Sequence, residues 1–111
     1  MREYLLILKG DGMKDMSPND LQAMFQEYQA WVKELGGKYV GGQRLENNGA
    51  LLTSREEPVI TDGPFLESKE IIAGYFLVQA KDFQEAIKIA QSGPHLGPYQ
   101  IEVRPLVWPK M

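Results

Sequence analysis

A short polar stretch, Thr61–Phe65, contains the side chain of this sequence that is best suited to acid–base chemistry. Asp62 begins a turn-forming run in which Gly63 accepts a positive φ and Pro64 fixes the backbone angle that follows. A carboxylate held in a partly desolvated cleft could act as a general base or orient one. The alternative role of Asp62 is structural, because an aspartate side chain also caps the turn that it begins.

The single histidine, His95, is the second candidate, because imidazole titrates close to neutral pH. It lies in residues 93–98, a loop of sequence GPHLGP whose two prolines could hold the ring in a fixed direction. Together with Asp62 it could transfer protons in an isomerase-like or lyase-like reaction. A loop histidine can equally be a solvated surface residue, and the sequence leaves both interpretations open.

Three further side chains, Tyr75, Arg104 and Glu70, are candidates for contact with a ligand. The Arg104 guanidinium could bind an anion, or it could pair with Glu67, Glu70 or Glu102. Tyr75 could offer its hydroxyl group, although a tyrosine on a central strand is also an ordinary core residue. Glu70 belongs to a charged cluster that solvation alone would explain.

The composition excludes several classes of site and partner. With no cysteine and one histidine, one subunit cannot form a disulfide, a thiolate zinc site or a histidine-rich metal centre, and we expect no metal and no cofactor. The net charge is −3 and the basic residues are scattered, which argues against nucleic-acid binding. No apolar run approaches about 18 residues, so we expect no membrane contact and a cytoplasmic location.

Hydropathy periods and cap residues predict the elements that must position these side chains. Strands are expected at residues 2–9, 38–45, 71–80 and 101–106. One helix should begin after Ser17 and end at Gly36, and another should begin after Asp82 and end at Gly93. Residues 50–55 and 58–61 predict a small inserted hairpin, and Gly41-Gly42 predicts a bulge or a close backbone approach.

Apolar spacing along the first helix predicts one buried stripe, formed by Leu21, Phe25, Tyr28, Val32 and Leu35. A second group of apolar residues near this helix suits either an adaptable ligand pocket or ordinary core packing. Its members are Met13, Met16, Phe25 and Trp31.

This order of elements is the split βαβ pattern of a ferredoxin-like α+β sandwich. Its two central strands are apolar on both faces: Phe76 and Val78 share one face, and Tyr75 and Leu77 share the other. Two helices can cover only one face of the sheet, and an exposed apolar face of this size is rare in monomers. The sequence therefore predicts a homodimer that packs sheet to sheet as an α+β barrel.

Two motifs resemble the DGPF-type branch of the YCII-related family over most of residues 1–111, as a single domain. The first is Thr61–Phe65 followed by Glu67, Lys69-Glu70 and Gly74-Tyr75, and the second is the closing strand Ile101–Pro105. The resemblance implies a dimeric α+β barrel. Some relatives resemble muconolactone isomerases, one branch dechlorinates aromatic substrates with a His–Asp pair in a cleft beside the sheet, and other members are associated with sigma factors.

The enzyme-like branch has its histidine near the start of the first helix, where this chain has none. Its catalytic residues therefore do not transfer to this sequence position by position. We expect a cytosolic homodimer that binds a small organic molecule in a cleft near the Asp62 turn. The alternatives are an enzyme that uses Asp62 and His95 for proton transfer, and an accessory interaction domain associated with a sigma factor.

Overall fold

The computed structural model describes residues 1–50, 52, 54–56 and 71–109. An antiparallel sheet of four strands in the order β2-β3-β1-β4 is joined by two helices and one 3-10 turn. The elements are β1 (Arg2–Lys9), α1 (Pro18–Leu35), η1 (Gly36–Lys38), β2 (Tyr39–Arg44), β3 (Ile72–Ala80), α2 (Phe83–Ser92) and β4 (Gln100–Pro105). This arrangement confirms the predicted ferredoxin-like α+β class, including the central position of the first and third main strands.

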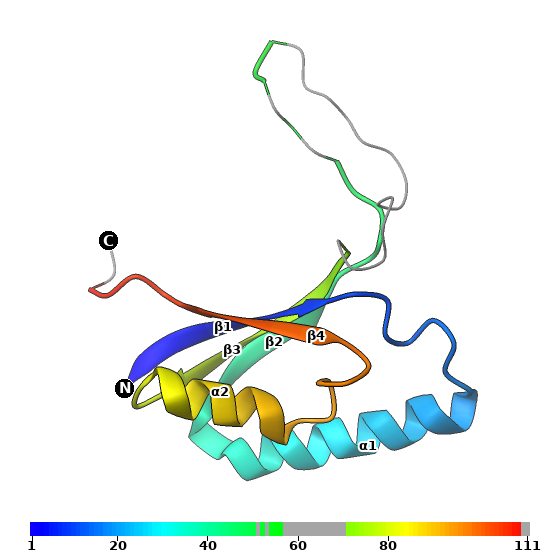
Figure 1. The fold of residues 1–111 in the computed structure, drawn as a ribbon, viewed down its shortest axis with the longest axis horizontal. Coiled ribbons are helices and arrows are strands. Elements are labelled where there is room, and N and C mark those ends of the chain that lie inside the picture. The colour runs from blue at the N-terminus through cyan, green and yellow to red at the C-terminus, as the bar shows by residue number, and fades with distance from the viewer. Residues whose placement is uncertain (51, 53, 57–70, 110–111) are drawn as a thin grey trace.

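Both helices lie on the same face of the sheet (Figure 1). Alternate residues of the two central strands point into the core beneath them, and these are Tyr4, Leu6, Leu8, Phe76, Val78 and Ala80. The opposite face remains uncovered by the helices (Figure 1). There, Leu5 pairs with Leu77 and Ile7 pairs with Tyr75, and all four side chains are half-buried.

The predicted helix starts are confirmed by their caps. The Asp20 backbone N–H donates to the Ser17 hydroxyl at 3.1 Å, and the Ser17 N–H donates to the Asp20 carboxylate at 3.4 Å. At the start of α2, the Glu85 N–H donates to the Asp82 carboxylate at 2.9 Å. Each cap satisfies a backbone donor that the helix itself leaves without a partner.

The predicted stripe on α1 is confirmed at Tyr28, Val32 and Leu35, which are half-buried and pack against the core, but it was wrong at its first two positions. Met24 and Trp31 are buried, with 8% and 4% of their surface exposed, whereas Leu21 and Phe25 are 38% and 57% exposed. A tertiary contact determines which face of α1 is buried. The Trp31 indole packs against Gly93, where an added Cβ would lie only 2.9 Å from the ring. The indole N–H also donates to the Ser92 hydroxyl at 2.9 Å, which fixes this face of the helix toward α2.

Two sequence predictions fall largely on residues that the structure does not describe. These are the inserted hairpin at 50–61 and the turn Thr61–Phe65. Among the described helices, none combines the length and the apolar character needed to cross a membrane.

The glycine pair in β2 has both features that the sequence suggested. The register between β2 and β3 shifts between Tyr39 and Gly41, which marks an irregularity in the strand. At Gly42, an added Cβ would lie 2.5 Å from Cδ1 of Phe76 and 2.7 Å from the Tyr75 carbonyl oxygen. Gly42 is therefore needed for close packing, whereas nothing lies within 4 Å of a Cβ built on Gly41.

We predict that Gly42→Ala destabilises the fold by about 1–3 kcal/mol, because the new methyl group overlaps Phe76 and the β3 backbone. Gly41→Ala is the matched control and should change the free energy of unfolding by less than about 0.5 kcal/mol. Urea unfolding followed by tryptophan fluorescence measures both variants. Equal stabilities of the two variants would contradict the packing described for Gly42.

Candidate functional site

A pocket of about 480 Å³ lies on the helix-covered side of the sheet, between α1, the β2–β3 pair and the loop that follows α2. Its wall is mainly apolar and aromatic. The lining residues are Leu8, Met13, Leu21, Met24, Phe25, Tyr28, Gly42, Gln43, Arg44, Ala73, Gly74, Tyr75, Phe76, His95 and Tyr99. Pockets for small organic molecules in proteins have this size and this composition.

His95 lies within a cluster of aromatic rings at this pocket. Its ring centroid is 4.8 Å from that of Phe76, 5.6 Å from that of Tyr28 and 6.1 Å from that of Trp31. Burial disfavours the charged imidazolium and lowers the pKa of His95 from 6.5 to about 4. The imidazole is therefore uncharged at neutral pH and can accept or donate a hydrogen bond.

A hydrogen bond between two tyrosines supports the pocket wall. The hydroxyl oxygens of Tyr28 and Tyr39 are 2.7 Å apart, and either group can be the donor. Burial, with the Tyr28 hydrogen bond as a smaller cause, raises the pKa of Tyr39, so this hydroxyl stays protonated at neutral pH. Tyr28 also stacks on Phe76, with 5.7 Å between ring centroids, which holds its ring beside His95.

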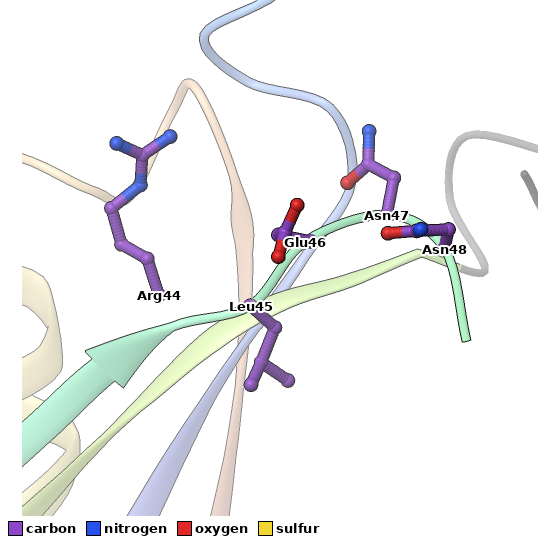
Figure 2. Close-up of a pocket in the computed structure, with 5 residues that line it drawn as sticks. All are labelled: Arg44, Leu45, Glu46, Asn47 and Asn48. Atoms are coloured by element: carbon purple, nitrogen blue, oxygen red, sulfur yellow. The ribbon is translucent and has the colours of Figure 1, made fainter. Parts of the chain in front are cut away.

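A second hollow, of about 600 Å³, lies beyond the end of β2 and is lined by the consecutive residues Arg44, Leu45, Glu46, Asn47 and Asn48. Their side chains point in different directions, and the Leu45 side chain points away from the polar ones (Figure 2). None of these five lining residues is aromatic. The pocket at His95 is therefore the stronger candidate, since its polar groups share one apolar enclosure.

The structure brings together some of the predicted site residues and separates others. His95 and Tyr75 both line the pocket, although strand alternation directs the Tyr75 side chain to the opposite face of the sheet. Arg104 lies on that opposite face, on β4, and pairs with Glu102 at 3.1 Å. Asp62 and Glu70 lie outside the described residues, so their roles remain predictions.

The apolar residues around α1 divide between the pocket lining and the core. Met13 and Phe25 line the pocket, whereas Met16 and Trp31 pack in or against the core. Sequence reasoning missed Arg44, which lines the pocket from the end of β2. The signal that could have found it is the glycine pair at 41–42, since Gly42 packs against Phe76 on the helix side and strand alternation puts Arg44 on the same face.

No group of three or more His, Cys, Asp or Glu side chains that could hold a metal ion occurs in the part of the chain that the structure describes. The described residues that line this pocket offer aromatic faces, one uncharged imidazole, tyrosine hydroxyls and one guanidinium.

Comparison with known proteins gives the family. The model of the YCII-related domain matches residues 4–108, which is nearly the whole chain. This chain belongs to the YCII-related family. An uncharacterized protein of Rhizobium meliloti (strain 1021) is 34% identical to this YCII-related protein over 94 residues, 78% of this chain and 70% of the relative. The DGPF-type branch remains a prediction, because the family model that matches is that of the YCII-related domain in general.

A solved structure shares the fold of this YCII-related protein. It is the 5-chloro-2-hydroxyhydroquinone dehydrochlorinase from Burkholderia phenoliruptrix AC1100, in complex with 2,5-dihydroxybenzoquinone. The TM-score is 0.51 and the identity is 14%, with 95% of this chain and 93% of the other covered. At this identity the likeness concerns the fold.

The pKa of His95 predicts how stability depends on pH. The folded-state pKa of about 4 lies below the ordinary 6.5, so the unfolded chain takes up the proton first as the pH falls. The contribution of His95 to the free energy of unfolding is fully present above pH 6.5. It falls by roughly 2–3 kcal/mol as the pH is lowered from 6.5 to 4. Urea unfolding at several pH values measures the loss.

The control for this prediction is His95→Gln, which removes the titrating group and keeps a polar side chain. The variant should lose less stability than the wild type between pH 6.5 and 4.5, since carboxylates contribute equally to both proteins. Parallel pH profiles of the two proteins would contradict the burial of an uncharged imidazole at this position.

Proposed function

We propose that this YCII-related protein binds a small organic molecule with a flat ring in the pocket between α1 and the sheet. The observation that supports this most is the uncharged His95 ring set among aromatic side chains in an enclosure of about 480 Å³. Phe25, Tyr28 and Phe76 offer ring surfaces against which a planar ligand could stack. The imidazole and the tyrosine hydroxyls would orient its polar substituents.

The fold neighbour supports this ligand class. The dehydrochlorinase of similar fold was solved with 2,5-dihydroxybenzoquinone, a single planar ring with oxygen substituents. A ring of that size fits easily into the pocket volume of this protein. The proposal itself rests on the lining residues of this chain.

A second candidate function is proton transfer, with His95 as the acceptor and Asp62 as its predicted partner. It is supported by the imidazole, which is uncharged at neutral pH and therefore has one unprotonated ring nitrogen that can accept a proton. The two candidates differ in outcome. A binding protein returns its ligand unchanged, whereas a proton-transfer enzyme returns an isomer or an elimination product, which NMR of the recovered ligand distinguishes.

The same proposal includes a homodimer that covers the open face of the sheet. Leu5, Ile7, Tyr75 and Leu77 form a continuous apolar patch across the two central strands on that face. Burying each such side chain is worth roughly 1.5–3 kcal/mol, which could offset the entropic cost of association. A two-fold contact between identical patches is the expected symmetry.

We predict saturable binding of N-phenyl-1-naphthylamine, an uncharged fluorescent aromatic probe, with a sharp rise in its emission. Phe25→Ala should reduce the affinity for the probe by roughly 3–10-fold, because a stacking surface is lost. Phe83→Ala is the matched control, since Phe83 on α2 is 42% exposed and does not line the pocket. Absence of saturable binding, or equal effects of the two variants, would contradict the proposed site.

For the dimer, we predict that wild-type protein sediments as a dimer at micromolar concentration and that Leu77→Asp sediments as a monomer. The reason is that a carboxylate in the middle of the apolar patch would have to be desolvated on association. Gln91→Asp, which adds the same charge at an exposed position of α2, should remain dimeric. A monomeric wild type would refute the sheet-to-sheet arrangement.

A further inference from the structure

We infer that the natural ligand is an organic anion whose acidic group is bound by Arg44 at the mouth of the pocket. This inference rests on the proposed binding function and names the chemical class of the ligand. The juxtaposition that supports it is one uncompensated guanidinium beside an enclosure that is otherwise apolar, aromatic or uncharged.

The charges at the pocket have one sign. Arg44 is the only lining residue with a charged side chain at neutral pH, and no aspartate or glutamate is among the lining residues that the structure describes. His95 does not contribute a second positive charge, since burial lowers its pKa to about 4. A bound molecule therefore meets a net positive charge from the described residues that line the pocket.

The position of Arg44 keeps its guanidinium available to a ligand. Arg44 is the last residue of β2 and pairs with Gly74, which also lines the pocket. Its guanidinium lies well apart from the Glu46 carboxylate (Figure 2). Within the described residues, the ion pairs are Lys9–Glu102, Lys38–Glu85 and Arg104–Glu102, and none of them involves Arg44.

Tyr99 shows that the charge of Arg44 reaches the pocket interior. Burial raises the pKa of the Tyr99 hydroxyl, and the positive charge of Arg44 opposes that rise. Asp11 acts on the same hydroxyl in the opposite direction, from outside the lining of the pocket. The Tyr99 ring is in turn 6.4 Å from the His95 ring, centroid to centroid, so Tyr99 is a neighbour of His95 and is within the electrostatic influence of Arg44.

The charge expected of the ligand follows from the free-energy cost of removing water from this guanidinium. An uncharged ring that fills the pocket would remove water from Arg44 and return no compensating interaction. A carboxylate, sulfonate or ionised phenol on the ring would instead accept charge-assisted hydrogen bonds, in the bidentate geometry that arginine favours. The predicted ligand is thus an aromatic or quinonoid acid whose ring lies inside and whose anionic group lies at the end of β2.

The test uses two fluorescent probes that share one ring skeleton and differ in one sulfonate: 8-anilino-1-naphthalenesulfonate and N-phenyl-1-naphthylamine. We expect the wild type to bind the sulfonate about tenfold more tightly. Arg44→Gln should remove this preference, and it should bind the uncharged probe at least as tightly as the wild type because the cost of desolvating the guanidinium is gone, which also shows that the variant is folded. Lys88→Gln, which removes the same charge from an exposed position of α2, should behave as wild type.

The outcomes separate the two proposals. If the uncharged probe binds but the sulfonate is not preferred, or if Arg44→Gln leaves the preference intact, the inference of an anionic ligand is overturned and the binding function stands. If neither probe binds, the binding function fails and this inference fails with it. If Arg44→Gln and Lys88→Gln reduce the affinity for the sulfonate probe equally, the effect comes from the net charge of the protein, and the role of Arg44 is overturned.

Discussion

The packing of one phenylalanine holds the candidate site together. The Phe76 side chain extends from the central strand β3 toward the helices. Its ring centroid lies 5.7 Å from that of Tyr28 and 5.2 Å from that of Trp31, both on α1. The His95 ring lies 4.8 Å from the same ring, and Gly42 has no side chain, so the β2 backbone can approach it closely. One residue thus fixes the distances between α1, β2 and the loop after α2, which are the walls of the pocket.

The electrostatics of the pocket follow from this packing. Aromatic neighbours remove water from His95, and desolvation keeps the imidazole uncharged at neutral pH. The Tyr28–Tyr39 hydrogen bond holds a second polar group in place at the same wall, with 2.7 Å between the two oxygens. Arg44 stands at the end of an edge strand, where water can still reach it while the pocket is empty. Ligand binding would change the solvation of Arg44 most, which is why this residue should discriminate by charge.

Local sequence patterns were sufficient to predict the helices and strands and their order along the chain. The Ser17 and Asp82 caps predicted the helix starts, and alternation predicted that Phe76 and Val78 share one face of β3, which the structure shows to be the helix side. The orientation of α1 could not be predicted in this way, because it depends on the contact of Trp31 with Gly93, 62 positions farther along the chain. Periodicity alone does not distinguish two overlapping stripes on one helix when a distant backbone decides between them.

The candidate site was predicted in part. His95 stood out as the single histidine, but the aromatic rings around it come from α1 and β3 and are not visible in the sequence of its own loop. Arg44 gave no local signal beyond the preceding glycines, since its importance arises from the absence of other charges around the pocket. Asp62 lies outside the described residues, and its role as a partner of His95 remains a prediction.

The most direct test of the account is methyl NMR of the five methionines during titration with N-phenyl-1-naphthylamine. Met13 and Met24 line the pocket, whereas Met1 and Met16 do not, and Met→Leu variants assign the signals. The account predicts that ring-current shifts from the probe appear at Met13 and Met24, together with a shift of the His95 ring protons, while Met1 and Met16 stay unchanged. Shifts confined to other methionines, with the His95 signals unmoved, would contradict a ligand pocket between α1 and the sheet.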